Sequence, residues 1–114
     1  VQLAIITGRN SAMVDQRARE IGIEQVIQGR EDKGAAAAAL AAELGLDADV
    51  VGYVGDDEPD VPAMEWAGLA FTVADAHDCA RAVAHYVATR GGGRGAVREI
   101  CDFVRAAIER SAAP

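Results

Sequence analysis

The sequence contains little of several residue types, and each shortage narrows the class of protein. It has one lysine beside ten arginines and only two cysteines, and aromatic residues make up 4% of its 114 positions. Two cysteines are too few for a disulfide framework or a four-cysteine metal site and suit a reducing compartment, so we expect a cytoplasmic protein. The longest uncharged stretches, 34–42 and 66–74, are too short to cross a bilayer, so we expect no membrane partner.

Basic charge is also scarce. Eleven basic residues against eighteen acidic ones give a formal net charge of −7, which would repel a phosphodiester backbone, so we expect no nucleic-acid partner. Hydrophobic residues make up 51% and charged residues 25%, as in ordinary globular proteins. A chain of this length holds one hydrophobic core, so we expect a single domain over residues 1–114.

Short apolar segments alternate with helical patterns along the chain. Segments 1–7 and 50–54 are apolar nearly throughout, as in strands that are buried on both faces of a parallel sheet. Because the chain opens inside such a segment, we expect that more sequence precedes it. The expected order is strand 1–7, helix 11 to about 20, strand 26–27, helix 33–45, strand 50–54, helix 61–67, strand 69–73, helix 79–84, strand 86–87 and helix 96–111.

This alternation indicates an α/β fold, namely a three-layer, Rossmann-like parallel sheet with helices on both faces. Ligands of such folds bind beyond the carboxyl ends of the strands. Three polar features lie at such positions: Thr7-Gly8-Arg9 after the first strand, Lys33 at a helix start, and the acidic loop 56–60.

Together, these features predict a phosphate and magnesium site. A hydroxyl and a free amide beside a glycine bind phosphate oxygens, and a lysine at a helix start adds its charge to the positive end of the helix. Carboxylates at a strand end, here Asp56 and Asp57, are the hard oxygen ligands that Mg²⁺ prefers. Since the chain uses arginine almost everywhere else, its one lysine, Lys33, indicates a specific task.

Each feature also has a simpler structural explanation. Thr7 fits an ordinary turn after a strand. Lys33 fits a solvated side chain near a helix start. The acidic loop fits a helix cap in which Asp60 precedes the helix that begins at Val61, with 56–58 exposed to solvent.

Four other polar residues and two aromatic ones are expected to be structural. His77, His85, Cys79 and Cys101 have no partners at metal-ligand spacing. Trp66 and Phe103 are expected to anchor the core or an interface.

The chain resembles a known family in the order of its motifs. Ile-Thr-Gly-Arg at 6–9, Lys33 and Gly-Asp-Asp-x-x-Asp at 55–60 resemble motifs two, three and four of the haloacid dehalogenase superfamily of aspartyl-phosphate phosphatases. The resemblance is narrowed to the capless 3-deoxy-D-manno-octulosonate 8-phosphate phosphatases by segments 28–33, 53–57, 73–77 and 92–99. It covers essentially the whole chain.

This resemblance implies a Mg²⁺-dependent phosphomonoesterase that acts on a small sugar acid phosphate and forms a homotetramer. By the same resemblance, the catalytic residues are Thr7, Lys33 and Asp60. The Mg²⁺ ligands are Asp56 and Asp57, and the substrate-binding residues are Gly8, Arg9, Arg94 and Arg98. A planar guanidinium group suits the carboxylate of a sugar acid.

The family's first motif, a strand that ends in an aspartate nucleophile, is not found in these 114 residues. We therefore expect the chain alone to be inactive and its sheet to lack a central strand between 1–7 and 50–54. Two further hypotheses remain open. One is a non-catalytic, phosphatase-like assembly domain, as in the tail of some sialic-acid cytidylyltransferases, and the other is a phosphatase of a nine-carbon sugar acid phosphate. Lys33 and the acidic loop argue against the first, because a scaffold does not need that charge cluster.

Overall fold

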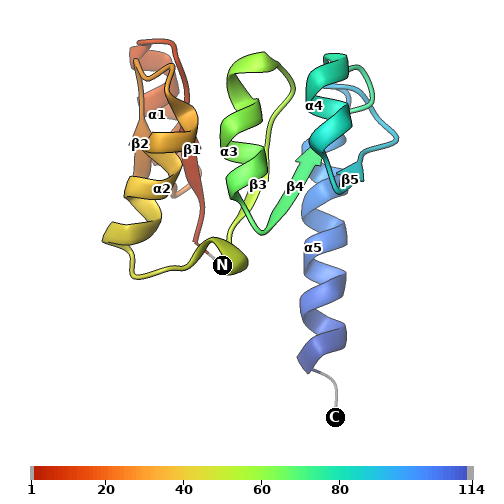
Figure 1. Cartoon of the computed structure of the whole chain (residues 1–114). Helices are drawn as coiled ribbons and strands as arrows, with labels where there is room; N and C mark the ends of the chain where they lie inside the picture. The colour runs from red at the N-terminus through yellow and green to blue at the C-terminus, as the bar shows by residue number, and fades with distance from the viewer. Residues whose placement is uncertain (1, 113–114) are drawn as a thin grey trace.

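Strands and helices alternate in the expected order in a computed structural model that describes residues 2–112 (Figure 1). The strands are β1 (Ala4–Ile6), β2 (Gln25–Ile27), β3 (Gly52–Val54), β4 (Leu69–Thr72) and β5 (Tyr86–Val87). The helices are α1 (Ala12–Glu20), α2 (Lys33–Glu43), α3 (Val61–Trp66), α4 (Asp78–Val83) and α5 (Ala96–Ala112). Two short 3-10 helices, η1 (Ala48–Val50) and η2 (Glu58–Asp60), flank β3 and its following loop. The α/β fold class is therefore confirmed.

The five strands form two parallel sheets. β1 pairs with β2 in one sheet, and β4 lies between β3 and β5 in the other. Across the view of Figure 1 the strands follow the order β2, β1, β3, β4, β5. Within residues 2–112, no ladder joins β1 to β3. This is the position at which a central strand was expected to be lacking.

The sequence predicted that β1 and β3 are buried on both faces of the sheet, and this prediction was wrong. Leu3, next to β1, is 59% exposed, and Val54 at the end of β3 is 43% exposed. Each strand has a ladder partner on one side only, which leaves apolar side chains in contact with water. The strand expected at 50–54 begins instead at Gly52, because Val50 belongs to η1. Of the segment expected at 1–7, Val1 lies outside the described residues.

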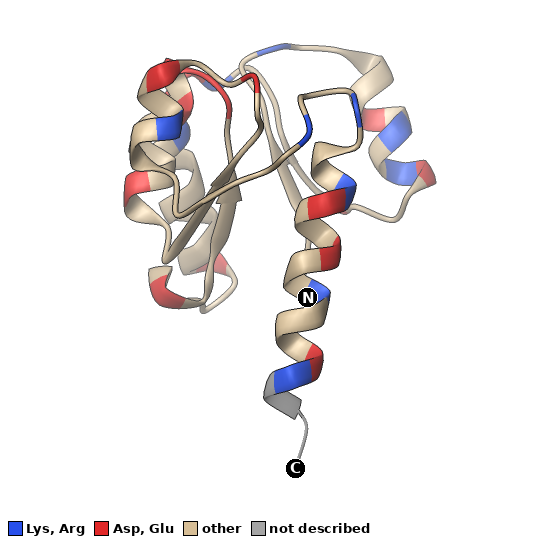
Figure 2. Ribbon diagram, turned by 90° about the vertical axis from the view of Figure 1, so that its right-hand side faces the viewer, with Lys and Arg blue, Asp and Glu red and all other residues tan. Residues whose placement is uncertain are grey.

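Helices cover both faces of the sheets. α2, α3 and α4 stand in a row on one face, and α1 and α5 lie on the other, so that the strands form the middle layer (Figures 1 and 2). Alternate residues of β4 serve the two layers. Ala70 packs with Met64 and Ala80 from α3 and α4, whereas the next residue, Phe71, packs with Ile100 from α5.

Small residues bring α2 and α3 close together at their first turns. A Cβ atom on Gly34 would lie 2.8 Å from the Cβ of Pro62, which is closer than real Cβ atoms approach. α2 also buries a mostly alanine face, consisting of Ala36, Ala37, Leu40 and Ala41. Since α2 follows the first sheet and α3 follows β3 of the second, this contact links the two sheets.

Aromatic rings attach α5 to the second sheet. The ring centre of Phe103 lies 4.6 Å from that of Tyr86 and 6.3 Å from that of Phe71. Phe103 is thus an anchor, as expected, and Trp66 is partly buried at the end of α3. Within the described part of the chain, no helix is both long and apolar enough to cross a membrane.

The two histidines make local structural contacts, as expected. The Nδ1 atom of His85 accepts a hydrogen bond from the Ala70 amide at 2.9 Å. His77 caps α4, where its Nδ1 accepts from the Cys79 amide at 3.3 Å. Cys79 and Cys101 are free thiols.

Candidate active site

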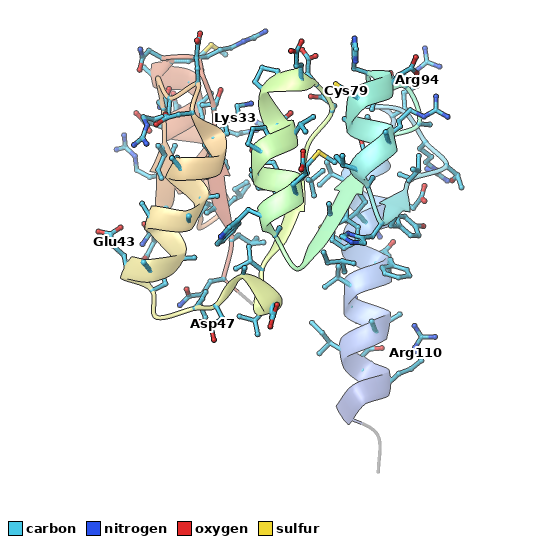
Figure 3. The ribbon with its side chains drawn as sticks, viewed as in Figure 1. Lys33, Glu43, Asp47, Cys79, Arg94 and Arg110 are labelled. Carbon is cyan, nitrogen blue, oxygen red and sulfur yellow. The ribbon has the colours of Figure 1, made fainter. Side chains whose placement is uncertain are left out.

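The polar residues singled out in the sequence lie around the carboxyl ends of the parallel strands. β1 and β3 both run toward this end, and α2 and α3 both begin there (Figure 1). In Figure 3, Lys33 projects from α2 toward α3, whereas Glu43 and Asp47 mark the opposite end of the fold. This is the edge at which ligands of α/β proteins bind.

The carboxylate of Asp60 is the centre of the site. Its Oδ1 atom lies 2.9 Å from the Nζ atom of Lys33 and accepts a hydrogen bond from the Tyr53 hydroxyl at 3.1 Å. Its Oδ2 atom accepts from the amides of Asp56 at 3.0 Å and Asp57 at 3.3 Å. One carboxylate therefore joins the first turn of α2 to the strand and loop of the second sheet.

Asp60 is only 4% exposed, yet its surroundings favour the charged form. Burial opposes the charge, but the Lys33 ammonium and the amides of Asp56 and Asp57 outweigh burial and hold the pKa of the carboxyl below its usual value. Burial and the Asp60 charge both raise the pKa of Tyr53. The tyrosine therefore remains a hydroxyl donor.

One of the simpler explanations is wrong, and the cap explanation of the acidic loop is correct only in part. Lys33 is not a solvated side chain, because only 18% of its side chain is exposed and it is paired with Asp60. Asp60 precedes α3 but makes no side-chain cap bond to that helix. The cap lies instead at the start of η2, where the Asp57 Oδ1 accepts from the Glu58 amide at 2.7 Å and Asp60 completes a capping box by accepting from the Asp57 amide. Residues 56–58 are exposed, as that explanation expected.

The acidic loop passes so close to Asp60 that only glycine fits at position 55. A Cβ atom on Gly55 would overlap the Cβ of Asp60 and lie 3.0 Å from the Sδ atom of Met64. The hydroxyl of buried Thr72 donates to the Gly55 carbonyl at 2.6 Å, which fixes this peptide against β4. The backbone therefore places Asp56 immediately beyond the end of β3.

Asp56 and Asp57 both lie exposed at the site, and the carboxyl group of Asp56 is perturbed by its surroundings. Burial, followed by the charges of Asp60 and Asp57, raises its pKa, so a nearby cation would relieve an excess of negative charge. Among residues 2–112, no group of three or more His, Cys, Asp or Glu side chains is arranged to hold a metal ion. Mg²⁺ is commonly bound by only one or two protein carboxylates together with water and phosphate. Asp56 and Asp57 fit such a partial ligand set.

Thr7, Gly8 and Arg9 follow β1 at the same end of the fold. The Thr7 hydroxyl accepts from the Arg9 amide at 3.1 Å, which is the turn contact of the simpler explanation. The Thr7 amide extends the ladder to the Ile27 carbonyl at 2.9 Å. Thr7 thus reaches the correct edge, but the structure does not bring it into hydrogen-bond contact with Lys33.

The remaining two arginines lie around the start of α5. Arg94 belongs to the loop between β5 and α5, where its amide donates to the Gly91 carbonyl at 3.1 Å. Arg98 lies on α5, with a side chain that is 83% exposed, and its Nε atom is 3.5 Å from Asp102. The structure therefore does not gather Arg98 with the residues around Asp60.

Two residues that form hydrogen bonds at this end of the fold were not predicted from the sequence: Tyr53, which donates to Asp60, and Glu99, which accepts from Tyr86 and Thr89. Tyr53 was assigned only to a strand, although it lies two residues before the glycine that opens the acidic loop. Glu99 received no role, although a glutamate in the first turn of a helix that follows a glycine-rich loop is a common signal of capping.

The chain matches the haloacid dehalogenase-like hydrolases over residues 23–98, and it belongs to this family. Among curated proteins, it is 44% identical over 110 residues to the 3-deoxy-D-manno-octulosonate 8-phosphate phosphatase of Yersinia pestis, covering 96% of this chain and 59% of the relative. It is also 44% identical over 104 residues to that of Escherichia coli K12, covering 91% of this chain and 55% of the relative. The chain thus spans somewhat more than half the length of the curated relatives it matches.

Solved structures show the same similarity. A 3-deoxy-D-manno-octulosonate 8-phosphate phosphatase from Moraxella catarrhalis, in complex with magnesium ion, phosphate ion and KDO, superposes with a TM-score of 0.89 at 47% identity, covering 91% of this chain and 60% of that one. A probable phosphatase from Pseudomonas syringae pv. phaseolica also gives 0.89, at 40% identity, covering 100% of this chain and 69% of that one. The expected family is confirmed.

Proposed function

We propose that this chain carries the Mg²⁺ and phosphate site of a phosphomonoesterase that acts on 3-deoxy-D-manno-octulosonate 8-phosphate. The observation that carries the proposal is the partly buried Lys33–Asp60 pair beside the exposed carboxylate of Asp56. This arrangement places the Lys33 ammonium, for the phosphate, and the Asp56 carboxylate, for the ion, at the same strand edge, as a magnesium-bound phosphate requires. The ligands of the Moraxella catarrhalis relative support the same substrate class here.

Each side chain then has a defined task. The Thr7 hydroxyl and the Gly8 amide bind phosphoryl oxygens, and Lys33 neutralises their charge. Asp56 and Asp57 hold the ion, which supplies further positive charge when bound. Asp60 positions Lys33, because its carboxylate fixes the ammonium at the start of α2.

The covalent step in this proposal requires an aspartate from outside the 114 residues. Its carboxylate forms a bond to the phosphorus as the bond to the sugar oxygen breaks, and that oxygen takes a proton from water. A water molecule then hydrolyses the aspartyl phosphate, which releases phosphate and restores the carboxylate. We place this aspartate on a strand between β1 and β3, which are neighbours in Figure 1 without a shared ladder. On this account the chain alone does not turn over substrate.

The sugar acid end of the substrate is assigned to arginines. Arg9, Arg94 and Arg98 lie outside the Asp60 centre, and a guanidinium group on the loop after β5 suits a carboxylate. A nine-carbon sugar acid phosphate also has a carboxylate and a phosphate, on a longer carbon chain. The assembly-domain alternative is disfavoured, because a scaffold does not require the exposed carboxylates of Asp56 and Asp57 beside the Lys33–Asp60 pair.

The proposal extends to assembly and compartment. A single domain of 114 residues leaves Leu69 of β4 and Val87 of β5 exposed, away from the facing edges of β1 and β3, and burial between subunits of a homotetramer would cover such surface. The two free thiols support a cytoplasmic location.

A chimera tests the proposed function. This chain replaces the segment that it matches in the Yersinia pestis relative, and phosphate release from 3-deoxy-D-manno-octulosonate 8-phosphate is measured with Mg²⁺. We expect turnover by the chimera, loss of turnover with Lys33→Met, and none from the 114-residue chain alone. The proposal is wrong if a folded chimera is inactive, or if the chain alone turns over in a manner that Asp56→Ala abolishes.

A further inference from the structure

The loop between β5 and α5 is held in a defined conformation by carboxylates. We name residues 89–95 the arginine loop, because they include Arg90 and Arg94. The loop continues the edge of the second sheet, since the Ala74 amide donates to the Arg90 carbonyl at 3.0 Å. In Figure 3, Arg94 lies beside the upper end of α4, at the strand end of the fold to which the acidic loop also belongs.

The first carboxylate is Glu99 from the first turn of α5. Its oxygens accept from the Thr89 amide at 2.9 and 3.0 Å, the Thr89 hydroxyl at 2.7 Å and the Arg90 amide at 3.3 Å. The Tyr86 hydroxyl donates to it as well, at 2.8 Å. These bonds lower the pKa of Glu99 to about 2, led by those from Thr89, so the group stays charged across the neutral range.

The second carboxylate is Asp75 from the loop after β4. Its Oδ1 accepts from the Gly92 amide at 2.8 Å. A Cβ atom on Gly91 would lie 3.0 Å from three atoms of the Asp75 carboxylate, which is tighter than most real contacts. Glycine at 91 therefore allows the arginine loop to lie directly on Asp75.

The segment 75–77, on which the arginine loop lies, is itself hydrogen-bonded to the acidic loop. The His77 amide, two residues after Asp75, donates to the Asp56 carbonyl at 2.9 Å. Hydrogen bonds thus connect the acidic loop to the segment 75–77, and they connect that segment to the arginine loop, along one edge of the fold. A ligand anchored at the acidic loop would extend across this edge toward the arginine loop.

The two cations of the arginine loop remain available. All the donors to Glu99 are uncharged groups, and within the described part of the chain neither Arg90 nor Arg94 forms an ion pair. Glu99 therefore fixes the backbone of the loop without neutralising its guanidinium groups.

We infer that Glu99 is a positioning residue: it holds the arginine loop so that Arg90 and Arg94 recognise the carboxylate of an acidic sugar phosphate. This inference rests on the proposed function for the phosphate end of the ligand. It adds that selectivity for a carboxylated sugar depends on the hydrogen bonds by which Glu99 holds the loop and on both arginines, one of which, Arg90, was not among the predicted substrate residues.

The test compares Glu99→Gln with Glu109→Gln in the full chain. Both substitutions remove one negative charge from α5, but Glu109 contacts only Arg105, at 3.1 Å, on an exposed surface. Two readouts are taken. Amide hydrogen exchange reports the loop, and calorimetric titration with orthophosphate, 6-phosphogluconate and sorbitol 6-phosphate in Mg²⁺ reports recognition. 6-Phosphogluconate carries a carboxylate that sorbitol 6-phosphate lacks.

We expect the unmodified chain and Glu109→Gln to bind 6-phosphogluconate more tightly than sorbitol 6-phosphate. In Glu99→Gln we expect the exchange of the Thr89 and Arg90 amides to rise by about tenfold or more, since bonds to a charged acceptor are lost. The preference for the carboxylated ligand should fall to about twofold or less, while the affinity for orthophosphate stays the same.

A retained preference or retained protection of the Thr89 and Arg90 amides in Glu99→Gln would overturn the inference, as would an equal loss of orthophosphate affinity. Absence of any preference in the unmodified chain also overturns it. Failure of orthophosphate to bind the unmodified chain would instead contradict the proposed function, and hydrogen exchange would still report on Glu99. If Glu99→Gln does not fold, Thr89→Ala removes one donor side chain, and an unchanged preference there overturns the inference.

Discussion

The Nζ atom of Lys33 lies 2.9 Å from the Oδ1 atom of Asp60, although the two residues are 27 positions apart and their side chains are only 18% and 6% exposed. The lysine begins α2 and the aspartate ends η2, so the ion pair connects the elements that follow the two sheets. Partly buried ion pairs of this kind are costly to break on one side, because the remaining charge loses its partner. The pair therefore serves both the stability of the fold and the site.

Removing the lysine is expected to destabilise the fold. From the sequence alone, a lysine at a helix start predicts little effect on stability, but the structure places it against nearly buried Asp60. We expect Lys33→Met to lower the free energy of unfolding by about 3 kcal/mol, as for one-sided loss of a buried pair. Urea denaturation measures this change.

The double variant Lys33→Met with Asp60→Asn is the control for this prediction. It removes both charges, so we expect it to be more stable than the sum of the two single effects indicates. Strict additivity of the two substitutions would show that the ammonium and the carboxylate do not interact in solution.

A methyl group at position 55 is expected to disrupt the acidic loop. In Gly55→Ala the new Cβ meets the Cβ of Asp60, so the loop or Asp60 has to move, at a cost of about 1 to 3 kcal/mol. The matched control is Gly92→Ala, whose Cβ would find its nearest atoms at 3.8 and 3.9 Å, an ordinary contact distance. Thermal unfolding of both variants checks the prediction, and equal melting temperatures would contradict the close approach at Gly55.

The attachment of α5 is expected to weaken in acid. The folded-state pKa of Glu99, about 2, lies below its ordinary value of 4.5, so its hydrogen bonds contribute stability that is complete above about pH 4.5 and is lost as the pH falls toward 2. The stability difference between the unmodified chain and Glu99→Gln should shrink over this range. Denaturation at a series of pH values measures the difference, and a constant value would contradict the assignment.

Assembly gives a further prediction. The exposed apolar residues of β4 and β5, including Leu69 and Val87, favour association into the proposed tetramer. Sedimentation velocity at micromolar concentration is expected to show an oligomer. A stable monomer would remove the assembly proposal and leave the site unaffected.

Much of the fold was predictable because its signals are local. The apolar run of β4 and the glycine at 45 after the alanine-rich α2 mark elements that form where the patterns place them. The exposure of β1 and β3 was not predictable from their own sequences. Burial of a strand depends on its neighbouring strands, and the sequence of an apolar segment does not indicate whether a neighbouring strand is present.

The site was predictable as a set of residues but not as a set of contacts. Lys33 was identified by its rarity and the acidic loop by its charge, and the structure joins them through Asp60. The division of work within the loop was not predictable, since Asp57 and Asp60 both fit a cap in sequence terms and only the backbone path decides between them. Glu99 was missed because its partners at 86, 89 and 90 precede it across a loop.

The most direct test of the central claim is calorimetric titration of orthophosphate with and without Mg²⁺. We predict that Mg²⁺ strengthens phosphate binding, that Asp56→Asn abolishes this dependence, and that Lys33→Met weakens binding by about 2 to 4 kcal/mol. Asp47→Asn, the same substitution at an exposed position on the opposite end of the fold, should behave as the unmodified chain (Figure 3). Equal affinities in all four proteins, with no effect of Mg²⁺, would contradict the claim that Lys33 and Asp56 form one phosphate and magnesium site.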